Sequence, residues 1–225
     1  MPSVRDFYQV NRGGGLFSEA FSQRLGAATA YAASRAGLRP TTLTLANLLV
    51  GLAASVIVVL RADSWSSWIG VLALVGWQVA YVLDCSDGQL ARVTGQRSAA
   101  GARIDILCDV ASQIALVTAI SAVAAARSDA PVWLLTMFAG TWMVNLITSV
   151  LQSGPNADSM MPSQSLPVRV VKLVRDPGVV FLLAGVVLAI QADWAVWYAA
   201  AFTFVNGGFL LASIAFTARK AYQPS

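Results

Sequence analysis

The chain has 225 residues and a net charge of +4, and 57% of its residues are hydrophobic while 12% are charged. Soluble domains carry roughly 25% charged residues, so this composition excludes an ordinary soluble domain and indicates an integral membrane protein. The chain contains no histidine, which removes the commonest side chain for acid–base chemistry near neutral pH. Such chemistry must therefore rely on carboxylates, Tyr, Lys or Cys.

The N-terminal segment is too polar to cross a membrane. Residues 1–15 are mostly polar and end in three consecutive glycines, which predicts a loop. Residues 16–36 place apolar side chains at helical spacing, with polar and charged residues between them. This pattern suits an amphipathic helix lying in the membrane interface. A helix packed on the protein itself is an alternative that does not exclude the first. Gly37 and Pro40 predict the end of this helix.

Six apolar stretches follow, and a stretch of about 20 apolar residues is long enough to span a bilayer. The expected spans are residues 41–60, 65–83, 104–126, 131–151, 179–190 with its flanks, and 194–216. We therefore expect an all-α integral membrane protein, with six transmembrane helices preceded by an N-terminal amphipathic interfacial helix. The whole chain, residues 1–225, is expected to form one domain, with residues 1–40 as a cytoplasmic or interfacial segment and residues 41–225 as the six-helix bundle.

The basic residues predict the orientation of these spans. If both termini are cytoplasmic, the outer loops hold two basic residues, Arg61 and Arg127, and the cytoplasmic segments hold the other thirteen. This asymmetry satisfies the positive-inside rule for six spans. It predicts a multi-pass protein of the cytoplasmic membrane, with the segment between the second and third spans on the cytoplasmic side.

That segment contains four of the eleven acidic residues of the chain, Asp84, Asp87, Asp105 and Asp109. Carboxylates at the ends of membrane helices are costly unless cations neutralise them. In helices, the first two lie three residues apart on one face and the last two lie four residues apart on one face. Two helices joined by a turn could therefore aim four carboxylates at one point. Oxygen ligands of this kind favour hard cations such as Mg²⁺ or Mn²⁺.

The segment follows the pattern Asp84-x2-Asp87-Gly88-x2-Ala91-Arg92-x8-Gly101-x3-Asp105-x3-Asp109. It resembles, at every fixed position, the signature of the CDP-alcohol phosphotransferases. The resemblance implies that Asp84, Asp87, Asp105 and Asp109 are the ligands of a site for two Mg²⁺ or Mn²⁺ ions. It also implies catalytic roles for Asp105 and for Asp109, the latter as the general base that takes the proton of the acceptor alcohol.

The resemblance further implies the contacts to the CDP-linked donor. Gly88 and Ala91 are small where the nucleotide must come close to the helix, and Arg92 can hold phosphate oxygens. The residues that begin the first span look like the Pro-Asn-x-x-Thr segment of the family, with Thr41 in the Asn position. The expected donor-binding residues are Thr41, Thr44, Asp84, Gly88, Ala91, Arg92, Ser98 and Gly101.

The implied reaction moves a phospho-alcohol from a CDP-linked donor to an acceptor hydroxyl and releases CMP, as in phospholipid biosynthesis. CDP-diacylglycerol is the expected donor, because a lipid-linked donor explains a site at the membrane face. Arg169, Lys172 and Arg175 either bind a phosphorylated polyol acceptor, such as inositol phosphate or glycerol phosphate, or anchor the chain on the cytoplasmic side. The expected partners are the donor, the acceptor, membrane lipids and a second copy of the chain, with no nucleic acid.

The aspartate segment is also compatible with two functions other than a transferase, a cation transporter and an idle scaffold. Four carboxylates near a membrane could line the pathway of a cation transporter or channel, but transport does not explain the glycines, alanine and arginine of the pattern. A catalytically idle scaffold of the same fold is opposed by the complete set of aspartates. Cys85 and Cys108 are too few for a zinc site and are predicted to be packing residues.

Overall fold

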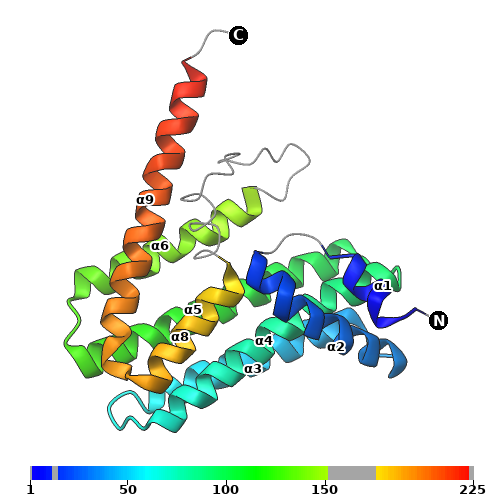
Figure 1. Cartoon of the computed structure of the whole chain (residues 1–225), viewed down its shortest axis with the longest axis horizontal. Helices are drawn as coiled ribbons and strands as arrows, with labels where there is room; N and C mark the ends of the chain where they lie inside the picture. Colours follow the sequence, from blue (N-terminus) through cyan, green and yellow to red (C-terminus); the bar gives the residue numbers. More distant parts are fainter. Residues whose placement is uncertain (1, 12–14, 152–175, 223–225) are drawn as a thin grey trace.

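A computed structural model describes residues 2–11, 15–151 and 176–222 of the chain, and the regular structure of these residues is entirely helical (Figure 1). The elements are α1 (Val4–Gln9), η1 (Ser18–Ser22, a short π-helix), α2 (Gln23–Arg35), α3 (Pro40–Leu60), α4 (Ser67–Val93), α5 (Ala99–Ser128), α6 (Val132–Leu151), α8 (Pro177–Ile190), η2 (Ala192–Trp194, a 3₁₀ turn) and α9 (Ala195–Ala221). The all-α prediction is therefore confirmed for the described residues.

Four helical segments are long and apolar enough to cross a membrane, and they fit a multi-pass membrane protein. They are Pro40–Leu60, Ser67–Val93, Ala99–Ser128 and Ala192–Arg219. The two other predicted spans correspond to α6 and α8, whose described apolar segments are Val132–Val144 and Pro177–Ile190. The 14 residues of α8 are about 21 Å long at 1.5 Å per residue. This length is less than the roughly 30 Å of a bilayer core.

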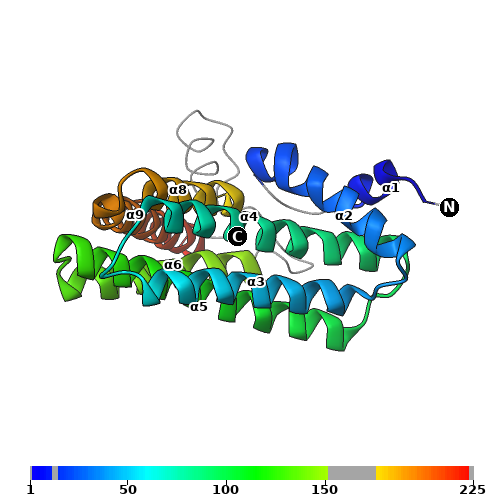
Figure 2. The same ribbon diagram turned by 90° about the horizontal axis from the view of Figure 1, so that it is seen from below.

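The long helices α3, α4 and α5 lie side by side, and α8 runs along α4 (Figures 1 and 2). Helices α4 and α8 approach closely because each presents a glycine to the other. A Cβ atom on Gly70 would clash with the backbone at Leu188, and a Cβ atom on Gly185 would clash with Leu74. Small residues allow such contacts between apolar helices, where dispersion forces between the backbones stabilise the pair.

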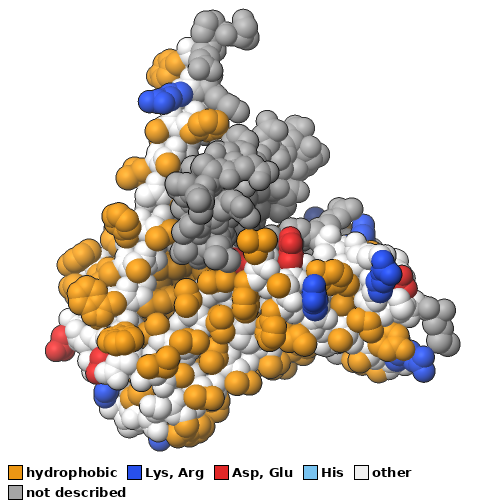
Figure 3. All heavy atoms as spheres, in the orientation of Figure 1, with side chains coloured by type: hydrophobic (Ala, Val, Ile, Leu, Met, Phe, Trp, Pro, Cys, Tyr) orange, Lys and Arg blue, Asp and Glu red, His pale blue; other side chains and the backbone are white. Residues whose placement is uncertain are grey.

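Helix α6 is joined to α9 and α5 by aromatic side chains. Trp142 stacks on Phe202 of α9 with 4.5 Å between the ring centroids. Its indole N–H also donates to the Oε1 atom of Gln113 on α5 at 2.9 Å. The C-terminal part of α9 extends away from the other labelled helices (Figure 1). In the view of Figure 3, apolar side chains cover most of the bundle, and basic side chains gather near α1 and α2.

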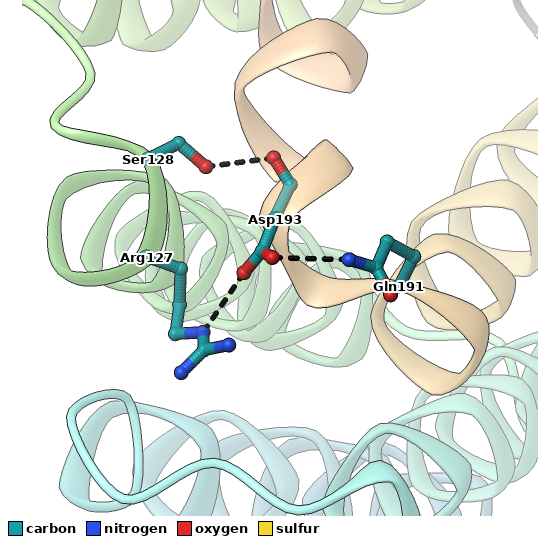
Figure 4. A network of polar contacts seen from close by, with 4 residues as sticks. All are labelled: Arg127, Ser128, Gln191 and Asp193. Carbon is teal, nitrogen blue, oxygen red and sulfur yellow. Dashed lines mark hydrogen bonds and ion pairs between the residues drawn. The ribbon is translucent and has the colours of Figure 1, made fainter.

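The turns after α3, α5 and α8 meet at one end of the bundle, where Ala62, Ala130 and Ala192 belong to one apolar cluster. Figure 4 shows the polar contacts there. The Nε atom of Arg127 donates to the carboxylate of Asp193 at 3.0 Å. The pair is 37% and 41% exposed, so it contributes at most about 1 kcal/mol to stability. The aspartate segment lies at the opposite ends of α4 and α5.

Helices α1 and α2 cover the C-terminal end of α4 (Figure 2). Their contact is an apolar cluster that includes Phe7, Ala30 and Leu90. The other side of the N-terminal segment leaves Phe21 48% and Leu25 44% exposed.

Helix α1 occupies part of the region predicted as a loop. The Asp6 carboxylate accepts hydrogen bonds from the N–H group of Ser3 at 2.6 Å and from the Ser3 hydroxyl at 2.9 Å. This contact caps the first turn of the helix, and it holds the pKa of Asp6 below its usual value. Within residues 1–15, the prediction of a loop was therefore wrong for Val4–Gln9.

Candidate active site

The four aspartates lie on α4 and α5, and the chain reverses direction between these two helices. Helix α4 ends at Val93 and α5 begins at Ala99, and Gly95 takes a positive φ of 69° in the connection, a conformation that glycine adopts without strain. The reversal brings Asp109 next to Asp84, and Asp105 next to Asp87.

A carboxylate oxygen from each of three residues, Asp84, Asp105 and Asp109, lies within 4.8 Å of the other two. This spacing is comparable to the roughly 4–5 Å between opposite ligands of Mg²⁺ or Ca²⁺, whose metal–oxygen distances are about 2.0–2.6 Å. These three side chains could therefore hold a metal ion. Asp87 completes the group, because it lies beside Asp105.

The surroundings of the carboxylates also fit a cation. The Oδ1 atom of Asp105 is buried and has no hydrogen-bond partner among the described residues. A buried carboxylate oxygen without a donor is costly, and neighbouring carboxylates repel one another unless a proton or a cation lies between them. A divalent cation would remove both costs. Its oxygen donors are of the hard type that Mg²⁺ and Mn²⁺ prefer.

Helix α3 supplies two polar side chains to the same site. The Thr44 hydroxyl donates to the Oδ2 atom of Asp87 at 2.6 Å, and the Nδ2 atom of Asn47 donates to the Oδ1 atom of Asp84 at 3.4 Å. Thr44 was among the predicted donor-binding residues, whereas Asn47 was not predicted. Its signal in the sequence was the position three residues after Thr44, on the same face of an otherwise apolar span.

Arg92 lies at the edge of the carboxylate group, next to Asp105. Its guanidinium folds back along α4 over Gly88, where an added Cβ atom would come within 2.9 Å of Nη1. The absence of a side chain at Gly88 therefore leaves the space that the Arg92 guanidinium occupies. Ala91 is the neighbouring small residue on the helix and is half-buried.

The other predicted donor-binding residues lie at the adjoining helix ends. Thr41 is in the first turn of α3, one turn before Thr44. Ser98 is the N-cap of α5, and its hydroxyl oxygen accepts from the N–H group of Gly101 at 2.9 Å. The predicted acceptor residues Arg169, Lys172 and Arg175 lie outside the described residues.

An all-helical bundle with four segments suited to cross a membrane, and with carboxylates from two helices gathered at one point, defines a multi-pass membrane protein with a site that could hold a metal ion. The profile of the CDP-alcohol phosphatidyltransferases matches residues 38–205 of the chain. The chain belongs to the CDP-alcohol phosphatidyltransferase family, whose members transfer phosphate-containing groups in phospholipid synthesis. No curated individual protein matches the sequence. Neither the family match nor the described residues support the alternative of a cation transporter.

Proposed function

We propose that the protein transfers the phosphatidyl group of CDP-diacylglycerol to a hydroxyl acceptor and releases CMP. The observation that carries this proposal is the meeting of Asp84, Asp105 and Asp109 within 4.8 Å, at the acidic positions of the sequence pattern, inside the segment that matches the family. We propose Asp84, Asp87, Asp105 and Asp109 as ligands of divalent cations, with Mg²⁺ or Mn²⁺ at two positions.

Bound divalent cations would supply positive charge beside the diphosphate and so stabilise the charge that develops on departing CMP. The chain itself holds and orients the donor. Arg92 offers a guanidinium to phosphate oxygens from its place over Gly88, and such contacts are often bidentate. Small and hydroxyl-bearing residues at the adjoining ends of α3, α4 and α5 are proposed to border the CDP group. They are Thr41, Thr44, Ala91, Ser98 and Gly101.

We propose Asp109 as the general base. The acceptor oxygen forms a bond to the phosphorus that carries the diacylglycerol, and its proton passes to the carboxylate of Asp109. The bond between that phosphorus and the bridging oxygen breaks, and CMP leaves with the bonding electrons. The products are a phosphodiester and CMP, and no covalent bond to the protein forms. A carboxylate suits this role because the chain contains no histidine.

The acceptor and the membrane setting complete the proposal. A phosphorylated polyol is the proposed acceptor, with Arg169, Lys172 and Arg175 as candidate phosphate contacts. We propose that residues 1–225 form one domain with six spans, that both termini and the active site face the cytoplasm, and that the protein is a homodimer. The exposed Phe21 and Leu25 support a membrane-interface position for the N-terminal helix.

Turnover with defined substrates tests this function. The purified protein, supplied with CDP-diacylglycerol and Mg²⁺ or Mn²⁺, is incubated with a panel of radiolabelled acceptors that includes inositol phosphate, glycerol phosphate and serine. We expect CMP and one labelled lipid product. Absence of CMP release with every acceptor, together with cation flux in liposomes, would support a transporter instead.

The contact between Thr44 and Asp87 gives a prediction for a smaller part of the site. Valine at position 44 keeps the shape of the side chain but removes the hydroxyl, which donates to a carboxylate at 2.6 Å. Because hydrogen bonds to charged groups contribute about 1.5–3 kcal/mol, we expect CMP release to fall roughly tenfold or more. Thr44→Ser retains the hydroxyl and serves as the control. Equal rates for the valine and serine variants would contradict this role.

A further inference from the structure

A buried carboxylate outside the aspartate group joins the N-terminal segment to α8. Asp176 is 2% exposed and precedes the first turn of α8. Its carboxylate accepts from the N–H groups of Phe17 at 3.1 Å, Ser18 at 3.0 Å and Gly178 at 2.9 Å. It also accepts from the Ser18 hydroxyl. Four donors therefore satisfy this carboxylate, and hydrogen bonds to an ionised group are the stronger kind.

The two joined segments also fit closely around this contact. An added Cβ atom on Gly15 would overlap the carboxylate of Asp176. One on Gly178 would come within 2.8 Å of the Phe17 ring and 2.9 Å of the Ser18 hydroxyl. The contact therefore depends on glycine in both segments, which lie far apart in the sequence.

The contact continues to α4 through a tyrosine. The Ser18 hydroxyl oxygen lies 2.8 Å from the hydroxyl of Tyr81. Because Ser18 donates its proton to Asp176, Tyr81 is the donor in this second hydrogen bond. The Tyr81 ring also packs edge-on against Phe181 of α8 with 5.5 Å between the centroids. Tyr81 lies three residues, less than one helical turn, before Asp84.

The N-terminal segment then follows the same face of α4 past the aspartates. Gly26 lies against Cys85, with 3.0 Å between a Cβ atom added to the glycine and the Cβ atom of the cysteine. The side-chain amide of Gln89 donates to the carbonyl oxygen of Gln23 at 3.0 Å. Positions 81, 85 and 89 recur every four residues and form one face of the helix. Asp84 and Asp87 lie on another face, where α3 contacts them.

We propose that Asp176 is a positioning residue of the transferase. Through Ser18 and Tyr81, its carboxylate holds residues 15–35 against the face of α4 formed by positions 81, 85 and 89. We call this contact the lock. It keeps Asp84 and Asp87 aligned with Asp105 and Asp109. These N-terminal residues lie outside the segment that matches the family, residues 38–205. The expected effect of the lock on kcat and on Mn²⁺ activation rests on the proposed function. The contact between the N-terminal segment and α4 does not depend on that function.

The two cysteines of the chain allow a test that is independent of turnover. Cys85 is half-buried and lies against the N-terminal segment at Gly26, and Cys108 is 4% exposed on α5. In Asp176→Asn, the amide cannot accept from all four donors, and the segment should open from α4. We expect N-ethylmaleimide to modify Cys85 about tenfold faster or more, as measured by mass spectrometry of the full-length protein, with the rate at Cys108 unchanged. Asp193→Asn, at the opposite end of the bundle, is the matched control and should leave both rates unchanged.

A kinetic experiment measures whether the loss of this contact changes turnover and cation activation. In Asp176→Asn, we expect kcat to fall and the half-saturating concentration of Mn²⁺ to rise severalfold, with the KM of the acceptor unchanged. Tyr81→Phe, which removes one hydroxyl and keeps the ring, should change both parameters in the same direction to a smaller extent. A general loss of folded protein would instead lower the rate without changing the half-saturating Mn²⁺ concentration.

Three results would overturn the proposal. They are an unchanged modification rate at Cys85, equal acceleration at Cys85 and Cys108, and faster modification of Cys85 with normal Mn²⁺ activation. If the wild-type protein itself releases no CMP, the proposed function fails. The modification rates of Cys85 and Cys108 in Asp176→Asn then test, without any activity measurement, whether Asp176 holds the N-terminal segment on α4.

Discussion

Asp105→Asn is expected to lower the proposed phosphatidyl transfer about a thousandfold or more, in a protein that still folds and inserts into membranes. Asp105 places a carboxylate oxygen within 4.8 Å of those of Asp84 and Asp109, and its buried Oδ1 atom has no hydrogen-bond partner in the part of the chain that the structure describes. The amide is neutral and offers a single oxygen. Metal ions contribute several kcal/mol to transition-state stabilisation, and each 1.36 kcal/mol is a factor of ten in rate.

The measurement is CMP release by the purified variant at saturating donor and acceptor. Asp193→Asn is the control, because it changes the same residue type at the other end of the bundle, where its partner is Arg127. The control should keep the wild-type rate. Elution of both variants as a single symmetrical peak would show that the fold survives. Near-normal turnover of Asp105→Asn would contradict its proposed role as a ligand.

Asp109→Asn is expected to lower kcat by about 10²–10⁴-fold, the range that general acid–base groups contribute, and to change donor affinity much less. The reason is that, in the proposed reaction, the proton of the acceptor alcohol is transferred only in the chemical step, whereas the other carboxylates and Arg92 remain as the proposed donor contacts. The comparison is between kcat and the Kd of CDP, measured by calorimetry at saturating Mg²⁺. The separation of these two quantities distinguishes proton transfer by Asp109 from a contribution of Asp109 to donor binding.

Asp109→Glu is the matched variant for this experiment, because it keeps a carboxylate and lengthens the side chain by one methylene group. We expect it to recover part of the lost rate. A result in which Asp109→Asn loses CDP binding and keeps its rate constant would reverse the assignment. Asp109 would then act mainly as a ligand, and another group would have to take the proton.

Local patterns predicted the parts of this protein that depend on short-range order. The apolar stretches predicted the long helices, and the aspartate spacing predicted carboxylates from two helices close together. The sequence also indicated Thr44, since the start of the first span resembles the family. Helix α8 was predicted as a span together with its flanks, but its 14 residues are fewer than those of the four segments that are long enough to cross a membrane. Hydropathy alone does not determine how short apolar helices are accommodated.

Long-range packing accounts for what the sequence did not predict. Asn47 became a site residue only because α3 packs beside α4. Asp176 contacts Ser18 across 158 positions of sequence, and neither residue belongs to a recognisable pattern. The close fit of Gly26 on Cys85 likewise depends on how α2 lies on α4. Such contacts follow from tertiary structure and not from the periodicity of a single helix.

The N-terminal helices illustrate how two interpretations of one pattern combine. The sequence left open whether residues 16–36 lie in the membrane interface or pack on the protein. In the structure, one side of this segment is buried against α4 through the cluster that includes Ala27 and Ala30. The side with Phe21 and Leu25 remains exposed, so the proposed interfacial position uses a face that the packing leaves available.

Direct measurement of cation binding tests the central claim without reference to turnover. Mn²⁺ is titrated into the purified protein, and bound Mn²⁺ is determined by electron paramagnetic resonance, with and without CDP. We predict that the wild-type protein and Asp193→Asn bind Mn²⁺ more tightly when CDP is present, and that Asp105→Asn binds it at least tenfold more weakly. Equal Mn²⁺ binding by the wild-type protein and Asp105→Asn would contradict a cation site formed by the aspartates of α4 and α5.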